Sequence, residues 1–139
     1  MFDLLKILIF GKWIVLTPSP ITIESTPLTV PPFKNLDVLT SGANVRVDVS
    51  GEFPRPRSIK YLEAVKAKYP IGCVKVSVDA EKQGERTLAN QLVSFGQDSI
   101  HLVFSANSGL EPDLHITAVS VSSCRRIQNA TVIWANYSQ

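Results

Sequence analysis

The sequence predicts an all-β protein in which two antiparallel sheets form a sandwich, with one short α-helix. The first observation is that apolar and polar residues alternate along most of the chain, as they do in 45–49 and 74–78. Alternation with a period of two is typical of strands that bury one face and expose the other. The second observation is that turn-forming residues recur between such runs, for example at 41–42, 84 and 107–109.

The length and composition indicate a single domain with its own hydrophobic core. The chain has 139 residues, of which 45% are hydrophobic and 19% are charged, and this balance is not that of a disordered segment. Its formal net charge is only +2, so no nucleic-acid partner is expected. The turn signals divide the chain into about seven or eight short strands, a count typical of immunoglobulin-like or related sandwiches.

Residues 1–17 form the most apolar stretch of the chain, and two alternatives describe it. In the first, it is a membrane anchor or interfacial helix whose lysines reach the lipid head groups. In the second, it is a short helix or a first strand packed on the domain core. Residues 2–16 are the expected contact with a membrane or a partner chain, through the side chains of Phe10, Trp13 and Ile14. The uninterrupted apolar run is shorter than the roughly 20 residues of a transmembrane helix.

The sandwich domain is expected to span residues 18–139 and to begin with a proline-rich lead-in at 18–32. Five of the nine prolines lie in this lead-in, and proline removes a backbone donor, so a helix or a central strand is excluded there. Between the prolines, Ile21–Ile23 and Leu28–Val30 alternate apolar and hydroxyl residues. We expect short edge strands, whose backbone is a candidate site for strand addition by a partner.

One segment departs from the period of two, because its apolar side chains recur at spacings of three and four. These apolar positions are Ile59, Leu62, Val65 and Tyr69. The spacing predicts a short amphipathic helix between Ser58 and Tyr69. Ser58 is placed to cap the start of the helix, and Pro70 ends it.

Two hairpins are expected in the second half of the chain. The runs 91–95 and 99–105 are separated by a short segment that contains a glycine, which is typical of a hairpin connection. A second hairpin, centred near Ser108, would join the run 99–105 to the run 114–122. It would place His101 opposite His115, and a cross-strand histidine pair is a weak candidate for a metal site. No further ligands are evident, so we expect solvated or hydrogen-bonded imidazoles and no metal.

Acidic residues form a second weak candidate for a cation site. In an up-and-down arrangement, the loops that follow 78 and 105 emerge at the same end of the sandwich. The acidic residues that these loops would bring together are Asp79, Glu81, Glu111 and Asp113. They lack an Asp-x-Asp spacing, and aspartate is a common turn residue, so we expect a solvated rim. No cofactor of any kind is expected.

Cys73 lies at the start of the predicted strand 74–78, and Cys124 lies just beyond the predicted strand 114–122. This separation is compatible with a bridge between strands, which would stabilise the fold by roughly 4 kcal/mol. Such a bridge persists only in an oxidising compartment. The alternative is two unrelated thiols, since free cysteine is commonly buried.

The strongest charge asymmetry of the chain lies in the predicted helix and the segment before it. The basic residues of this patch are Arg55, Arg57, Lys60, Lys66 and Lys68, and Glu63 is the only acid among them. Exposed lysine and arginine are normal on an outer helix face, which is the first interpretation. In the second, the patch contacts anionic head groups of a membrane.

The sequence holds no pattern that identifies a catalytic centre. It contains neither a CxxC or four-ligand zinc pattern nor a nucleophile with a local signature. We expect a non-enzymatic binding or structural module, extracytoplasmic and membrane-associated, that binds a protein partner or a second copy of itself. The alternative is a soluble intracellular subunit of a larger assembly, with reduced cysteines. A metal-dependent ligand-binding domain or an enzyme is the third hypothesis, and the sequence assigns no small-molecule ligand.

Overall fold

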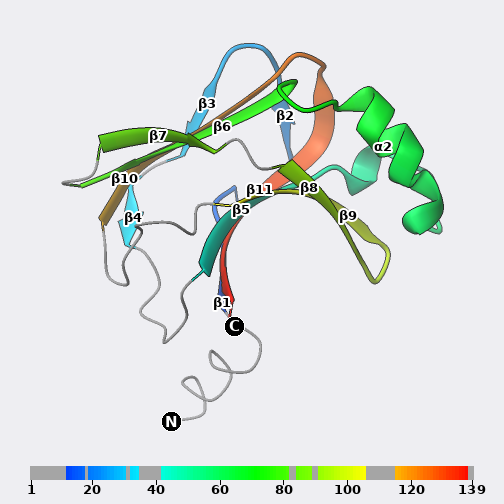
Figure 1. The fold of residues 1–139 in the computed structure, drawn as a ribbon, viewed down its shortest axis with the longest axis horizontal. Helices are drawn as coiled ribbons and strands as arrows, with labels where there is room; N and C mark the ends of the chain where they lie inside the picture. Colours follow the sequence, from blue (N-terminus) through cyan, green and yellow to red (C-terminus); the bar gives the residue numbers. More distant parts are fainter. Residues whose placement is uncertain are drawn as a thin grey trace, which may run out of the picture.

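The computed structural model describes residues 12–17, 19–30, 32–34, 42–81, 84–88, 91–105 and 115–137. These residues form two antiparallel sheets with one α-helix at one end of the sandwich (Figure 1). Buried side chains from both sheets belong to one hydrophobic cluster. The predicted all-β fold, an antiparallel sandwich of two sheets, is therefore confirmed.

The first sheet has the strand order β1-β11-β5-β9-β8, and β2 pairs with another part of β11. Its strands are β1 (Lys12–Val15), β2 (Ile21–Ile23), β5 (Gly42–Asp48), β8 (Gln91–Gly96), β9 (Ser99–Ser105) and β11 (Ile127–Tyr137). Strands β8 and β9 form the first of the two predicted hairpins. Because β8 is the last strand in this order, one of its edges has no neighbouring strand among the described residues.

The second sheet has the order β3-β10-β6-β7, and β4 pairs with the beginning of β10. Its strands are β3 (Leu28–Val30), β4 (Phe33–Lys34), β6 (Val74–Ala80), β7 (Gly84–Leu88) and β10 (His115–Ser123). Along β6, alternate residues are buried, as the period of two predicts. At the core, Trp134 of β11 is completely buried.

The end of the apolar segment 1–17 belongs to the first sheet. Strand β1 pairs with β11, and the Leu16 N–H donates to the Val132 carbonyl oxygen over 2.8 Å. Ile14 packs against the core, and Trp13 lies in β1 opposite Ala135. Phe10 lies outside the described residues. No helix in the described ranges is long and apolar enough to cross a membrane.

The predicted helix is present but starts differently. A 3-10 turn, η2 (Ile59–Tyr61), precedes α2 (Leu62–Lys68), and Tyr69 closes the helix by donating its N–H to the Val65 carbonyl oxygen. Val65 and Tyr69 are completely buried, whereas Ile59 is 70% exposed. The expected place of Ile59 on the apolar stripe is wrong because the first turn has the tighter 3-10 period. Ser58 makes no side-chain capping bond, so that prediction is wrong too.

Cys73 and Cys124 form a disulfide, with their Cα atoms 4.9 Å apart. The bridge lies just beyond the last pair of the β6–β10 ladder, in which Val74 is opposite Ser123. The Cys124 N–H also donates to the Cys73 carbonyl oxygen over 2.9 Å. The disulfide therefore joins neighbouring strands of one sheet at their ends, and the prediction of an inter-strand bridge is confirmed.

Candidate partner-binding groove

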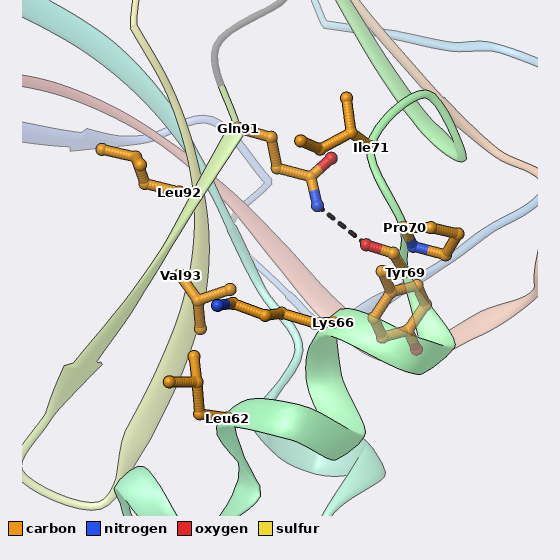
Figure 2. A pocket seen from close by; sticks show the side chains of 8 residues that line it. All are labelled: Leu62, Lys66, Tyr69, Pro70, Ile71, Gln91, Leu92 and Val93. Carbon is orange, nitrogen blue, oxygen red and sulfur yellow. Dashed lines mark hydrogen bonds between the residues drawn. The ribbon is translucent and has the colours of Figure 1, made fainter.

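A groove of about 680 Å³ lies between helix α2 and the edge strand β8 (Figure 2). This volume is within the range of small-molecule sites in proteins. One wall comes from α2 and the turn that follows it, and the other wall comes from β8. The lining side chains include Leu62, Lys66, Ile71, Gln91, Leu92 and Val93. Because most of them are apolar, the groove favours a ligand with apolar side chains.

The turn after α2 exposes an apolar side chain at the mouth of the groove. The Cys73 N–H donates to the Pro70 carbonyl oxygen over 2.9 Å and closes the turn. Gly72, its third residue, has a φ of +96°, which favours glycine because a Cβ would be strained there. Ile71 stands next to it and is 79% exposed, and Leu92 on the opposite wall is 65% exposed. These two side chains give the groove an apolar rim.

Gln91 connects the two walls of the groove. Its Nε2 donates to the Tyr69 carbonyl oxygen over 2.8 Å, which ties the start of β8 to the end of α2 (Figure 2). The Oε1 of Gln91 and the hydroxyl of Tyr69 are buried without a hydrogen-bond partner among the described residues. Burial, together with the negative charge of Glu52, raises the pKa of Tyr69 far above its ordinary value. The Tyr69 hydroxyl is therefore neutral.

A second hollow, of about 350 Å³, adjoins the groove at Ile71 and Gln91, which line both. Its remaining walls come from the end of β7, the start of β6 and β9, with Leu88 and Lys75 among the lining residues. The groove and the second hollow thus follow the side of the sandwich where both sheets end, at the edge strands β7 and β8.

The hydrogen bonds of Ile100 in β9 show which backbone groups of β8 are not hydrogen-bonded to β9. Its N–H donates to Ser50 Oγ over 2.8 Å, and its carbonyl oxygen accepts from the Val49 N–H over 2.9 Å. Both backbone groups of Ile100 therefore face away from β8. Phe95, the residue of β8 that is opposite Ile100, consequently belongs to a pair without ladder hydrogen bonds.

The same alternation extends along the whole of β8. Antiparallel ladders alternate between hydrogen-bonded and non-hydrogen-bonded pairs. If the pair at Phe95 is not hydrogen-bonded, the pairs at Val93 and Gln91 are not hydrogen-bonded either. The N–H and carbonyl groups of these three residues therefore point to the free edge of β8, beside the groove.

Strand β8 differs from the other described edge strands in carrying no residue that blocks pairing. Natural edges are commonly protected by charges, prolines or short length. Strand β7 carries Glu85 and Arg86, β1 carries Lys12, and β2 and β3 have three residues each in the proline-rich lead-in. Strand β8 has six residues with neither a charge nor a proline. Among the described edge strands, it is the one open to strand addition.

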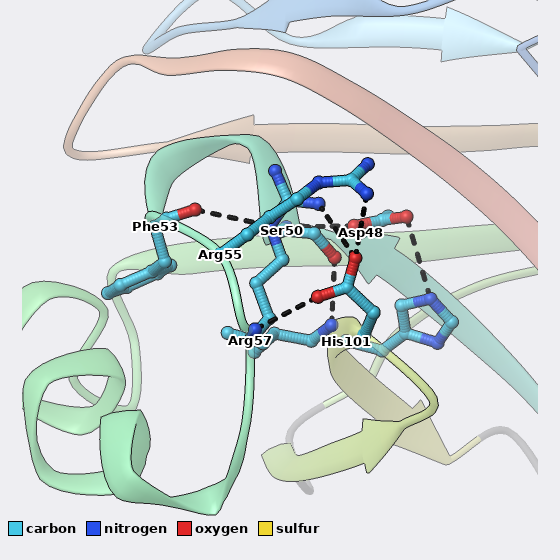
Figure 3. A network of polar contacts seen from close by, with 8 residues as sticks. Asp48, Ser50, Phe53, Arg55, Arg57 and His101 are labelled. Carbon is cyan, nitrogen blue, oxygen red and sulfur yellow. Dashed lines mark hydrogen bonds and ion pairs between the residues drawn. The ribbon is translucent and has the colours of Figure 1, made fainter.

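A polar cluster connects the end of β5 with β9 (Figure 3). The Nε2 of His101 lies 3.7 Å from the Oδ2 of Asp48, and the Asp48 Oδ1 accepts the Ser50 N–H over 2.8 Å. Burial alone would raise the pKa of Asp48, but the ion-pair contact with His101 and the hydrogen bond from Ser50 outweigh it and hold the pKa below its ordinary value. A catalytic relay needs the imidazole between the hydroxyl and the carboxylate. Here the carboxylate lies between the imidazole and the Ser50 backbone, which is a different arrangement from that relay.

Three residues of the predicted basic patch are paired with carboxylates. Arg55 and Arg57 both contact the Asp98 Oδ2, at 3.2 and 3.6 Å, and the Arg57 N–H donates to the Asp98 Oδ1. Figure 3 shows how the two arginines extend from the segment after Phe53. Lys68 contacts the Glu52 Oε2 at 3.3 Å. These cations hold the loops of this end of the sandwich together.

The other two residues of the basic patch, Lys60 and Lys66, form no ion pair within the described ranges. The Lys60 Nζ lies 5.2 Å from the centre of the Tyr61 ring, while Lys66 lines the groove. The patch is thus divided into paired cations, one cation on an aromatic ring and one cation in the groove.

The predicted hairpin between His101 and His115 is wrong. His101 lies in the first sheet, where it is opposite Asp48 and Ser94. His115 begins β10 in the second sheet, opposite Lys34. The chain passes from one sheet to the other between β9 and β10, so the two histidines are not cross-strand neighbours.

The acidic rim is not assembled by the residues that the structure describes. Asp79 lies in β6 opposite Glu85, and Glu81 follows the end of that strand. Glu111 and Asp113 lie outside the described residues. Within the described ranges, no group of three or more histidine, cysteine, aspartate or glutamate residues could hold a metal ion.

Comparison with known proteins gives no relative: no family model, no curated protein and no solved structure matches this chain.

Proposed function

We propose that this chain is a protein-binding module that takes up an extended segment of its partner along the free edge of β8. The observation that carries the proposal is the unblocked edge of β8 beside an apolar groove. In strand addition, backbone hydrogen bonds supply affinity, and pockets for alternate side chains supply specificity. Gln91, Val93 and Phe95 offer the backbone groups, and the wall formed by α2 offers the surface for side chains.

The proposed location of this module is outside the cytoplasm. The Cys73–Cys124 disulfide supports that location, because disulfides persist in oxidising compartments. Membrane attachment through residues 2–16 is not part of the proposal, because Lys12–Val15 pair with β11 in the first sheet.

The test is amide hydrogen exchange measured by NMR, with peptides selected from a display library of random linear sequences. In the free protein, the amides of Val93 and Phe95 are expected to exchange rapidly, while those of Leu92 and Ser94 are protected by β9. Bound peptide should protect Val93 and Phe95 as well. The proposal is overturned if the library yields no binder, or if bound peptides leave both amides unprotected.

Two lysine substitutions provide a matched comparison. Leu92→Lys places a charge on the free edge of β8, and Val15→Lys places the same charge on β1, at the opposite end of the sheet. Both side chains are more than half exposed, at 65% and 52%, so both variants should fold. We expect Leu92→Lys to weaken peptide binding about tenfold, through lost apolar contact and a blocked edge, and Val15→Lys to have no effect. Equal effects of the two substitutions would contradict the proposed site.

A further inference from the structure

We infer that the partner segment is acidic, with carboxylates that lie against Lys66 in the groove and Lys75 in the second hollow. This inference rests on the proposed strand addition to β8 and specifies the chemistry of the segment that is added. It follows from the charges that line the two hollows.

Among the described residues, each hollow is lined by one lysine and by no carboxylate. Lys66 is the charged residue of the groove, and Lys75 is the charged residue of the second hollow. Both side chains are exposed, and neither forms an ion pair with another described residue. An acidic segment would be attracted to both lysines, whereas a basic segment would meet two like charges and no compensating acid.

Several other cations of the described residues are already neutralised by a carboxylate, unlike these two lysines. Arg57, Lys68 and Arg126 all lie within 4 Å of a carboxylate, at Asp98, Glu52 and Glu24. Lys66 in the groove beside β8 and Lys75 in the adjoining hollow have no such partner among the described residues. The charge of Lys66 is therefore available beside the free backbone of β8, and the charge of Lys75 is available in the hollow that adjoins the groove at Gln91.

The position of Lys66 suits recognition of a strand. In Figure 2 its side chain extends from α2 across the groove toward β8 and Val93. The aliphatic part of a lysine covers apolar surface while its ammonium stays hydrated. A carboxylate on a strand beside β8 can therefore pair with Lys66 while apolar neighbours contact the groove wall. A single-stranded nucleic acid fits less well, because Tyr69, the aromatic residue of the groove lining, is completely buried and offers no stacking face.

The experiment selects the same random linear peptide library on the wild-type protein and on the double variant Lys66→Met/Lys75→Met. Methionine keeps a long apolar side chain and removes the charge, and both positions are exposed, so folding should be preserved. We expect aspartate and glutamate to be enriched over lysine and arginine among wild-type binders, and this enrichment to disappear with the variant. Lys60→Met is the matched control, because Lys60 lines neither hollow.

Affinities of one selected peptide then give a quantitative check. Exchange of its glutamate for glutamine should weaken binding to the wild type by up to about fivefold at low salt, and by less at high salt, as for a solvent-accessible ion pair. The exchange should have no effect with the double variant. The inference is refuted if binders that protect the β8 amides show no acidic enrichment, or if the enrichment survives in the double variant. A library without any binder at β8 would refute strand addition itself.

Discussion

Removing the Cys73–Cys124 disulfide is expected to lower the free energy of unfolding by about 4 kcal/mol. The perturbation is the double substitution Cys73→Ala/Cys124→Ala. The two cysteines are 51 residues apart in the sequence, and a cross-link over that length removes the corresponding loop-closure entropy from the unfolded chain. The folded state should change little, because the Val74–Ser123 pair and the hydrogen bond from the Cys124 N–H hold the same strand ends together.

The corresponding change in Tm is about 14 °C. Unfolding entropy near the melting temperature is about 2.1 cal/mol/K per residue, and the chain has 139 residues. A domain of this size has a total stability of roughly 5 to 15 kcal/mol. The variant should therefore still fold at room temperature in most of this range, so that its unfolding can be measured.

The assay is thermal and urea unfolding followed by circular dichroism. It compares the oxidised wild type, the wild type with a thiol reductant and the double alanine variant. We expect the last two to coincide, well below the oxidised wild type, and to show a larger m-value because the unfolded chain without the cross-link exposes more surface. The loop-entropy reasoning is refuted if the variant melts at the temperature of the oxidised wild type. It is also refuted if the reduced wild type remains more stable than the variant.

Four further substitutions test the core, the polar cluster and the turn beside the groove. Asp48→Asn should lower stability by about 1 to 2 kcal/mol at neutral pH. The lowered pKa means that the carboxylate stabilises the fold above the ordinary carboxyl range and ceases to do so as the pH falls through the folded-state pKa. Urea melts across pH should therefore show wild type and variant converging in acid, and a constant difference would contradict this. Ser50→Ala leaves the buried Ile100 N–H without its acceptor and should cost about 1 to 3 kcal/mol in the same melts. Trp134→Ala should cost about 3 to 5 kcal/mol, since the side chain is completely buried, and a smaller loss would mean that the core collapses around the site. Gly72→Ala has space for the new Cβ but a φ of +96°, so a loss of about 1 kcal/mol in thermal melts is expected from backbone strain alone.

The strands and the helix were largely predictable because their signals are local. Val74–Ala80 buries alternate residues in the structure as it does in the sequence pattern, and the hairpin of β8 and β9 forms as its glycine-containing connection indicates. The helix was located by the spacing of Val65 and Tyr69, which are both completely buried. Its first turn was misjudged, because the choice between a 3-10 turn and an α-helix has no clear signal in a single short segment.

The connection after β9 could not be predicted, because a hairpin and a crossing between sheets leave the same local pattern. Both join two amphipathic strands through a polar loop. The choice depends on which neighbouring strands bury each inner face, and β9 lies beside β5 while β10 lies beside β6. The metal hypothesis for His101 and His115 depends on this choice, because the two residues are cross-strand neighbours in a hairpin but lie in different sheets here.

The groove was missed for a related reason. The run 91–95 is recognisable in the sequence as a strand, but nothing in it indicates that it is the last strand of its sheet. The sequence indicates edge strands in the proline-rich lead-in instead, and these short strands pair with β11 and β10. Of the predicted basic residues, only Lys66 lines the groove, and the carboxylates that neutralise Arg55 and Lys68 come from distant parts of the chain.

The sequence by itself determined the class of the fold, the position of the helix and the two cysteines able to form a bridge. The fold class and the helix depend on the period of burial within one segment. The disulfide pairing has no alternative, because the chain has two cysteines. Only the tertiary structure decided which strand is left at an edge, which cations remain unpaired and which apolar side chains border a hollow. Those properties depend on segments far apart in sequence, because an edge or a free charge is defined by the neighbours that a residue does not have.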